Sequence, residues 1–447
     1  MHGQATHAVS AIFGLNPVWI AVALFIATYA LIMTDKINRA ILALLGAGLL
    51  ILLGVLTQDE AMRAVDFNTL GLLLGMMLIV NITRHSGLFQ YVAIWSAKQV
   101  NASPWGILLM MSIVTAVFSA FLDNVTTVLL TVPVTMLITE ELKVKPYPYL
   151  FAQIFASNIG GTATLIGDPP NIMIGSAANL TFNDFALNLT PVIIVVLVAT
   201  LIPLWFIWGR HLAADQEHRQ RVMNFNEREA ITDVRLLKQS LTVIALVILG
   251  FMLQRQIRIE PATIAIFGAA ALLLLDNFGK EAEKQSQKVH AALSEAEWIT
   301  LMFFLGLFVL VHGLEKTGVI HWMAERLLEA TGGDFKVTTL AILWASAVLS
   351  AFIDNIPFVA TMIPLIKALG PTFGGEHALL PLWWSLSLGA CLGGNGTLIG
   401  ASANLVVVGL AERAGTGFRF MEYLKIAFPL MLVSIVICHA YLYARFL

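Results

Sequence analysis

Two Asp-Asn pairs interrupt apolar segments that are otherwise able to enter a membrane. Asp123-Asn124 lies within one such run, and Asp354-Asn355 lies within another, 231 positions later (354 − 123). Burying a charge in hydrocarbon costs about 3 kcal/mol on insertion scales, so a membrane carboxylate generally faces a cavity, a partner or an ion. Burial raises the proton affinity of such a group, and a nearby donor or cation lowers it. We therefore predict that Asp123 and Asp354 bind protons or a cation.

The residues after each Asp add neutral oxygen atoms. Asn124, Asn355, Thr126 and Thr127 are candidate ligands for a substrate or an ion. Two alternatives stay open. Each Asp, with its Asn, caps the helix that follows, and each Thr hydroxyl bonds back to its own helix.

Each half of the chain also carries a glycine-rich stretch inside an apolar segment. Such a stretch breaks a helix and frees N–H groups at one new end and carbonyl groups at the other, which attract polar ligands and cations. Asn171 and Asn404 are candidate caps of the restarted helices. Asp168 is either a third ionisable group or, as we favour, a turn residue before Pro169. The remaining candidate ligands in the two stretches are Asn158, Gly160, Gly161, Thr162, Thr164, Gly394, Asn395, Thr397 and Ser402.

The two halves match in register. Gly75 pairs with Gly306 and Asp123 with Asp354 at a spacing of 231 (306 − 75 and 354 − 123), and Gly160 pairs with Gly393 at 233 (393 − 160). Repeated halves with interrupted apolar segments are typical of secondary transporters. Ala401-Ser402-Ala403 replaces Asp168-Pro169-Pro170 in the second half, so the two breaks are not chemically equal.

Composition places these residues in a membrane. The chain has 447 residues, of which 58% are hydrophobic and 12% charged, with a mean hydropathy of +0.82. Soluble domains carry about 25% charged residues. The net charge of −2 argues against a nucleic-acid partner. Two cysteines provide no disulfide framework or zinc spacing, and we find no cofactor motif, no metal site and no pair of nucleophile and base. We therefore expect neither an enzyme nor a bound cofactor.

The expected fold is an all-α polytopic membrane protein made of two inverted repeats. We predict a first repeat at 1–209, a cytoplasmic linker at 210–238 and a second repeat at 239–447. About ten helices cross the membrane, beside two re-entrant hairpins and two broken helices. The crossing segments are predicted at 17–33, 38–57, 69–83, 187–208, 240–254, 261–275, 298–313 and 426–446, the hairpin arms at 105–121 with 125–139 and 338–353 with 357–369, and the broken segments at 148–179 and 381–410.

Charge distribution gives the expected orientation. Most of the 26 Lys and Arg residues fall in loops on one side when each half crosses an odd number of times. Because cytoplasmic loops are enriched in Lys and Arg, we expect the linker in the cytoplasm and the N-terminus outside, in the cell inner (plasma) membrane.

The motifs Phe121-Leu122-Asp123-Asn124-Val125-Thr126-Thr127 and 158–171 resemble the ArsB/NhaD-type branch of the ion transporter superfamily, which includes the P-protein and its bacterial relatives. The resemblance spans nearly the whole chain. It implies a scaffold domain, a moving transport domain that contains both hairpins, elevator-like alternating access and a homodimer. It also implies that the tips and the breaks together form the site.

We therefore expect a proton-coupled secondary transporter with a small inorganic substrate. Arsenite or antimonite efflux is the leading expectation, because neutral arsenite needs no fixed cation and neither motif contains Arg or Lys. The alternatives are a sodium/proton antiporter, an anion carrier of the same superfamily and, from another class, a passive channel without coupling. Whether a cytoplasmic ATPase partner docks stays open.

Overall fold

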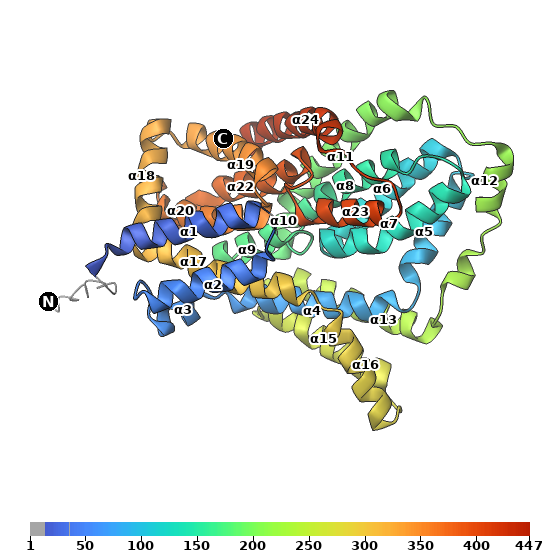
Figure 1. The fold of residues 1–447 in the computed structure, drawn as a ribbon, viewed down its shortest axis with the longest axis horizontal. Coiled ribbons are helices and arrows are strands. Elements are labelled where there is room, and N and C mark those ends of the chain that lie inside the picture. Colours follow the sequence, from blue (N-terminus) through green and yellow to red (C-terminus); the bar gives the residue numbers. More distant parts are fainter. Residues whose placement is uncertain (1–13, 35) are drawn as a thin grey trace.

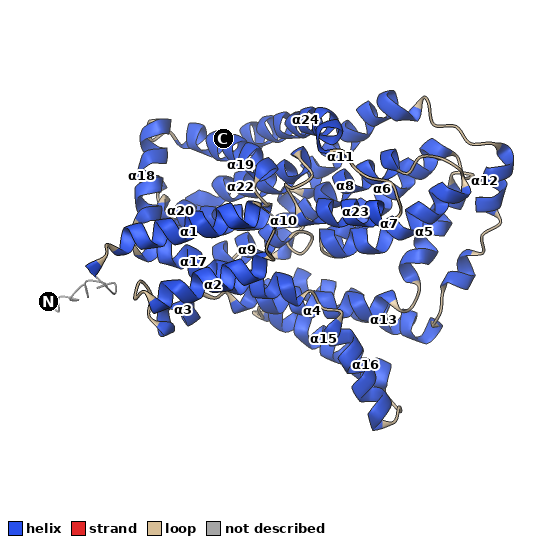
Figure 2. Cartoon of the chain, viewed as in Figure 1, coloured by secondary structure: helices blue, strands red, loops and turns tan. Residues whose placement is uncertain are grey.

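The computed structural model describes residues 14–34 and 36–447, and the regular structure in that part of the chain is helical throughout (Figure 1; Figure 2). The expected all-α polytopic architecture is confirmed. Apolar composition alone does not set the helix ends. Asn16, Asn38, Asp66 and Asp334 each accept a backbone N–H bond at the start of an apolar helix, as N-cap residues do.

The first half contains the helices up to the predicted linker. These are α1 (Pro17–Met33), α2 (Arg39–Leu52), α3 (Gln58–Ala64), α4 (Phe67–Arg84), α5 (Leu88–Gln99), α6 (Pro104–Phe121), α7 (Asn124–Glu141), α8 (Tyr147–Thr162), α9 (Pro169–Ala178), α10 (Phe182–Asn188) and α11 (Thr190–Leu204), which continues as a π-turn (Trp205–Gly209). The linker contains α12 (Gln216–Met223) and a 3-10 turn (Glu227–Ala230).

The second half repeats this order. Its helices are α13 (Val234–Met252), α14 (Gln254–Ile257), α15 (Pro261–Asn277), α16 (Ala282–Ser294), α17 (Trp298–Lys316), α18 (Val319–Thr331), α19 (Phe335–Phe352), α20 (Asn355–Ala368), α21 (Gly370–Phe373), α22 (Leu380–Gly393), α23 (Ser402–Arg413) and α24 (Phe420–Phe446), with 3-10 turns at Glu376–Leu379 and Gly394–Gly396.

The helices of the described residues fit about ten crossings. Seven are long and apolar enough to span a membrane, and two of these seven, α6 and α19, are hairpin arms. The other five are joined by the shorter apolar helices α1, α2 and α15 and by two interrupted segments, α8 with α9 and α22 with α23. Both predicted hairpins and both predicted breaks are therefore present.

One bundle, here called the exchanged bundle, combines α2 and α4 of the first half with α15 and α17 of the second half. α4 of the first half packs on α15 of the second, and α17 of the second half packs on α2 of the first. Both contacts are close because the facing residue is glycine. A Cβ on Gly75 would lie 2.6 Å from the carbonyl carbon of Ala265, and one on Gly306 would lie 2.5 Å from that of Ala43. Small residues let membrane helices approach in this way.

The hairpins and the broken helices form a second bundle. α6 and α7 pack on α8, α19 packs on α22, and α8 packs on α22 across the two halves. α9 contacts α20, and α23 contacts α7, so each break lies against the hairpin of the other half. This arrangement brings all four irregular backbone segments together.

The two ends of each half lie far apart. Figure 1 shows the start of α1 at one end of the long axis and α12 of the linker at the opposite end, with the C-terminus nearer to the α1 end. An odd number of crossings in each half produces this placement. The predicted external N-terminus falls on residues 1–13, which lie outside the described residues. The division at 210–238 and the orientation in the membrane stay predictions.

Candidate transport site

Each hairpin turns at an Asp that caps its second arm. The Asp123 carboxylate accepts the backbone N–H of Thr126 at 2.8 Å and also the Thr126 hydroxyl. The Asp354 carboxylate accepts the N–H of Ile356 at 3.1 Å. The capping interpretation is therefore correct for both residues. Capping is compatible with the binding of a proton or a cation by the same carboxylate. Thr127 shows no bond back to its helix, since its buried hydroxyl has no partner.

The hairpin tips are fixed to the breaks by repeated hydrogen bonds. Ser119 donates to the carbonyl of Ser157 and Ser350 to that of Ala390, both at 2.6 Å. After each break, a threonine hydroxyl bonds back to its hairpin: Thr164 to the carbonyl of Ala120 and Thr397 to that of Ala351. The sequence register of the repeats thus holds at the level of single atoms.

A row of amide side chains joins the two halves at the centre. Asn124 donates to Asn158 Oδ1 at 3.1 Å, and Asn158 Nδ2 lies 2.9 Å from the Oδ1 atoms of Asn395 and Asn404. All four residues are buried. Two atoms of this row, Asn124 Oδ1 and Asn395 Nδ2, have no hydrogen-bond partner. A buried unpaired acceptor beside carboxylates is a feature that a ligand would satisfy.

Asp168 is the most deeply buried acid at the site. Its side chain has no exposed surface, and its carboxylate oxygens accept from Asn355 Nδ2 at 3.3 and 3.4 Å. It precedes α9 but makes no capping bond to it. Asp168 does lie in the bend before Pro169, as we favoured, and its side chain also reaches across to the hairpin of the other half. The equivalent position in that half is Ala401, so this contact has no counterpart.

Asn171 and Asn404 hold the broken ends in a way that differs from our expectation. Asn171 Nδ2 donates to the carbonyl of Thr164 at 2.9 Å and more weakly to that of Thr162, and Asn404 Nδ2 donates to the carbonyls of Gly394 and Thr397. They therefore satisfy freed carbonyl groups at the end of the preceding helix and in the break, and they do not cap the helices in whose first turn they lie.

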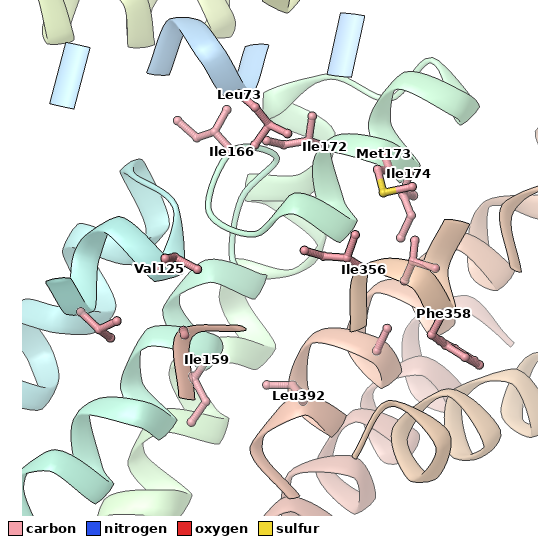
Figure 3. Close-up of a cluster of buried hydrophobic side chains, with 14 of the residues drawn as sticks. Leu73, Val125, Ile159, Ile166, Ile172, Met173, Ile174, Ile356, Phe358 and Leu392 are labelled. Carbon is pink, nitrogen blue, oxygen red and sulfur yellow. The ribbon is translucent and has the colours of Figure 1, made fainter. Parts of the chain in front are cut away.

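A small cavity of about 10 Å³ lies where these groups converge, which is room for about one water molecule. Leu73, Val125 and Ile356 form its apolar wall, and Figure 3 shows them in the surrounding cluster of buried hydrophobic side chains. The low dielectric of such a wall strengthens electrostatic interactions inside. The polar residues of the lining are Asp123, Asn124, Asp168, Asn355, Glu297, Thr300, Arg39 and Ser402.

Arg39, Thr300 and Glu297 enter this site from the exchanged bundle. The Arg39 guanidinium lies 3.1 Å from the Asp354 carboxylate, 2.6 Å from Ser402 Oγ and 3.1 Å from Thr300 Oγ1. Thr300 in turn donates to Glu297 at 3.1 Å. Neither Arg39 nor Glu297 was predicted, because both lie far from the motifs in sequence.

The glycines of the breaks have a packing role. A Cβ on Gly160 would lie 2.1 Å from the carbonyl oxygen of Ala116, and one on Gly161 would lie 2.5 Å from that of Gly167. Gly394 meets the backbone of Gly400 in the corresponding way, at 3.0 Å. These residues, with Thr162, whose hydroxyl bonds within α8, shape the site without lining the small cavity.

Comparison with known proteins supports this reading of the architecture. A family model described as CitMHS, citrate transporter, matches residues 29–389 of this chain. The chain belongs to the CitMHS family. It is therefore a membrane transporter, in agreement with the expectation that it is not an enzyme.

Relatives of this CitMHS chain include an uncharacterized transporter of Mycobacterium tuberculosis (Rv2684), which is 42% identical over 96% of this chain and 98% of its own length. The P protein of Homo sapiens is 34% identical over 95% of this chain, which spans 59% of the P protein. The YdaH transporter of Alcanivorax borkumensis has the same fold, with a TM-score of 0.56 and 14% identity over 97% of this chain and 99% of the YdaH chain. The resemblance to the P-protein is confirmed, whereas the ArsB/NhaD type stays a prediction.

Cys391 of this CitMHS chain is buried beside Asp168 and Asn171. Its buried sulfur lies 3.6 Å from Asn171 Oδ1, an atom that also accepts the Ser387 hydroxyl at 2.6 Å. The cysteine is absent from the lining of the small cavity. A small buried packing residue fits this position.

Proposed function

We propose that this chain is a proton-coupled secondary transporter, and that its cavity is best suited to a small monovalent cation such as sodium or lithium. The observation that carries the proposal is that the buried Asp168 contacts Asn355 and Cys391 but no basic side chain. Among the described residues, neither Asp168 nor Asp123 forms an ion pair with a basic side chain, although both are buried. An unpaired buried carboxylate is stable only when it holds a proton or a cation.

Competition between the cation and protons for the same carboxylate oxygens would couple the movement of one to the movement of the other. A cation in the small cavity would be held by the carboxylates of Asp123 and Asp168 and by the unpaired Asn124 Oδ1. When the cation leaves, the cost of two bare carboxylates in an apolar surrounding favours the uptake of protons. Cation and proton therefore exclude each other, and the carrier exchanges one for the other.

The size of the cavity bears on the cargo. Sites for organic ligands enclose roughly 300–1,000 Å³, whereas this cavity encloses about 10 Å³. A citrate ion also carries negative charges that would meet three acidic side chains, while the single guanidinium is already paired. These observations favour a monatomic cation over a tricarboxylate.

Arsenite or antimonite export is the second candidate. The observation in its favour is the unpaired acceptor of Asn124 together with the unpaired donor of Asn395, because a neutral trihydroxide can bond to both kinds of group. The argument from the absence of a fixed cation no longer favours it, since Arg39 reaches the site.

Alternating access follows from the two bundles. The exchanged bundle of α2, α4, α15 and α17 and the bundle of hairpins and breaks are each built from both halves, and the site lies at their contact. Inverted repeats allow one bundle to move against the other. We therefore propose elevator-like movement of the hairpin bundle, in a homodimer as the family resemblance implies.

The test uses the purified chain in proteoliposomes that contain a pH-sensitive dye. An imposed pH gradient is challenged separately with sodium, lithium, potassium, arsenite, antimonite and citrate. We expect sodium or lithium to drive proton movement, and we expect Asp123→Asn and Asp168→Asn to abolish it. Both variants should fold, because asparagine is close in shape to a protonated aspartate and also caps a helix. Asp215→Asn, at an exposed carboxylate of the linker, is the matched control.

Three results would contradict the proposal. One is full cation-driven proton movement in both Asn variants. A second is proton movement with arsenite and none with any cation, which would assign the arsenite function. A third is flux of any of these species without proton movement, which would indicate a channel.

A further inference from the structure

Arg39 stands between two cavities. It lines the small cavity of about 10 Å³ and also a vestibule of about 320 Å³ that continues past Asp354 toward the start of α2. The two spaces share Arg39, Val125, Glu297 and Ser402. Asp354 lines only the vestibule, and Asp123 and Asp168 line only the small cavity. These four shared residues, of which Arg39 is the only cation, therefore lie between the vestibule and the buried carboxylates.

The contacts of Arg39 join the two bundles. The residue begins α2, which packs on α17, whereas Asp354 and Ser402 begin α20 and α23. One guanidinium nitrogen is shared by the Asp354 carboxylate and Ser402 Oγ, and the other bonds to Thr300 of α17. The face of the guanidinium also lies 5.1 Å from the ring centre of Phe303. The side chain is thus held in place from both sides, with 25% of its surface exposed.

The second half provides no equivalent of this arginine. Ala43 and Ala265 occupy matching places against Gly306 and Gly75, which sets a spacing of 222 between α2 and α15 (265 − 43). Gly46 and Gly268 keep the same spacing (268 − 46). The position that matches Arg39 is then Pro261 (39 + 222), which has no charge and no side-chain donor. The interaction exists on one side of the pseudo-symmetric molecule only.

We propose that Arg39 is a built-in counter-ion and gate, which pairs with Asp354 to close the small cavity against the vestibule. The pair has to open before an ion or a proton can pass from the vestibule to Asp123 and Asp168. Because Arg39 belongs to the bundle opposite the hairpin, the same pair also holds the tip of the second hairpin in this position. The identity of the transported species rests on the proposed function, whereas the proposal that Arg39 closes the small cavity does not depend on it.

The test measures how fast a thiol behind the gate reacts. In a background of Cys391→Ala and Cys438→Ala, one reporter is Ile356→Cys, which lines the small cavity only, and the other is Leu405→Cys, which lines the vestibule only. The purified full chain in detergent, where both membrane faces are accessible, is labelled with a charged methanethiosulfonate reagent. Labelling rates are compared with and without Arg39→Ala, and with Arg235→Ala at an exposed arginine as the matched control.

We expect Arg39→Ala to raise the labelling rate at Ile356→Cys about tenfold or more. A tenfold change corresponds to a loss of about 1.4 kcal/mol in the free energy that favours the closed gate over the open gate. Arg39→Ala should change the labelling rate at Leu405→Cys by less than about twofold. Arg235→Ala should change the rate at either reporter by less than about twofold. Asp354→Asn keeps the arginine but removes its charged partner, and it should also raise the labelling rate at Ile356→Cys.

An unchanged rate at Ile356→Cys in both Arg39→Ala and Asp354→Asn would overturn the proposal. Equal rates at the two reporters in the parent protein would also overturn it, because no closure would then exist. The labelling rates do not depend on proton coupling. The gate can therefore be confirmed or refuted whether or not the chain exchanges sodium for protons in vesicles.

Discussion

Replacement of Asn158 by alanine should be among the most destabilising single changes in the polar core. This side chain makes three hydrogen bonds, one to Asn124 of its own half and two to Asn395 and Asn404 of the other half. Each bond contributes about 1–1.5 kcal/mol net, and the partners left behind would be buried and unpaired. We therefore expect Asn158→Ala to lower the free energy of unfolding by about 3–4.5 kcal/mol, the product of three bonds and that range.

The measurement is reversible unfolding of the purified chain in detergent, or its thermal midpoint where unfolding is irreversible. Asn224→Ala is the control, since Asn224 is exposed in the linker and its side chain accepts one bond from Gln220. It should change stability by less than about 0.5 kcal/mol. A loss below about 1 kcal/mol for Asn158→Ala would refute the reasoning, because it would mean that the amide row is not a connected network.

Three further predictions follow from other contacts. Gly306→Val should prevent the chain from accumulating in membranes, because its Cβ would lie 2.5 Å from the backbone of Ala43; normal yield would contradict this. Ser350→Ala should cost about 1 kcal/mol of stability through loss of its single carbonyl bond, and an unchanged melting curve would contradict that. The hydrogen bond from Lys316, together with those from Thr57, lowers the pKa of Glu60 from 4.5 to about 2. A depressed carboxyl pKa stabilises the fold above pH 4.5, so Lys316→Met should cost under about 1 kcal/mol at pH 6. That difference should disappear as the pH falls toward 2, and a difference that persists there would have another cause.

The repeat was the part of the architecture that sequence could predict best. Matching glycines and Asp-Asn pairs located both hairpins and both breaks, because irregular backbone in an apolar segment requires residue types that stand out. The capping by Asp123 was predictable for the same reason, since an N-cap bond is local.

Contacts made across the halves were not predictable. Arg39 follows a loop far from either motif, and only the packing of α2 on α17 brings it to Asp354. Asp168 was assigned to a turn because Pro169 follows it, whereas tertiary packing directs its carboxylate to Asn355. The direction of the Asn171 amide was also missed, because either broken end could use it and the sequence does not show which end lies nearer.

Proton release on cation binding tests the central claim most directly, because it requires no transport. Sodium is added to the purified chain in weakly buffered detergent solution, and the pH is followed with a dye. If sodium and protons compete for the carboxylates of Asp123 and Asp168, sodium should release protons, whereas Asp168→Asn should release fewer and Asp215→Asn as many as the parent. Sodium binding without proton release, or equal release from Asp168→Asn and the parent, would contradict the account.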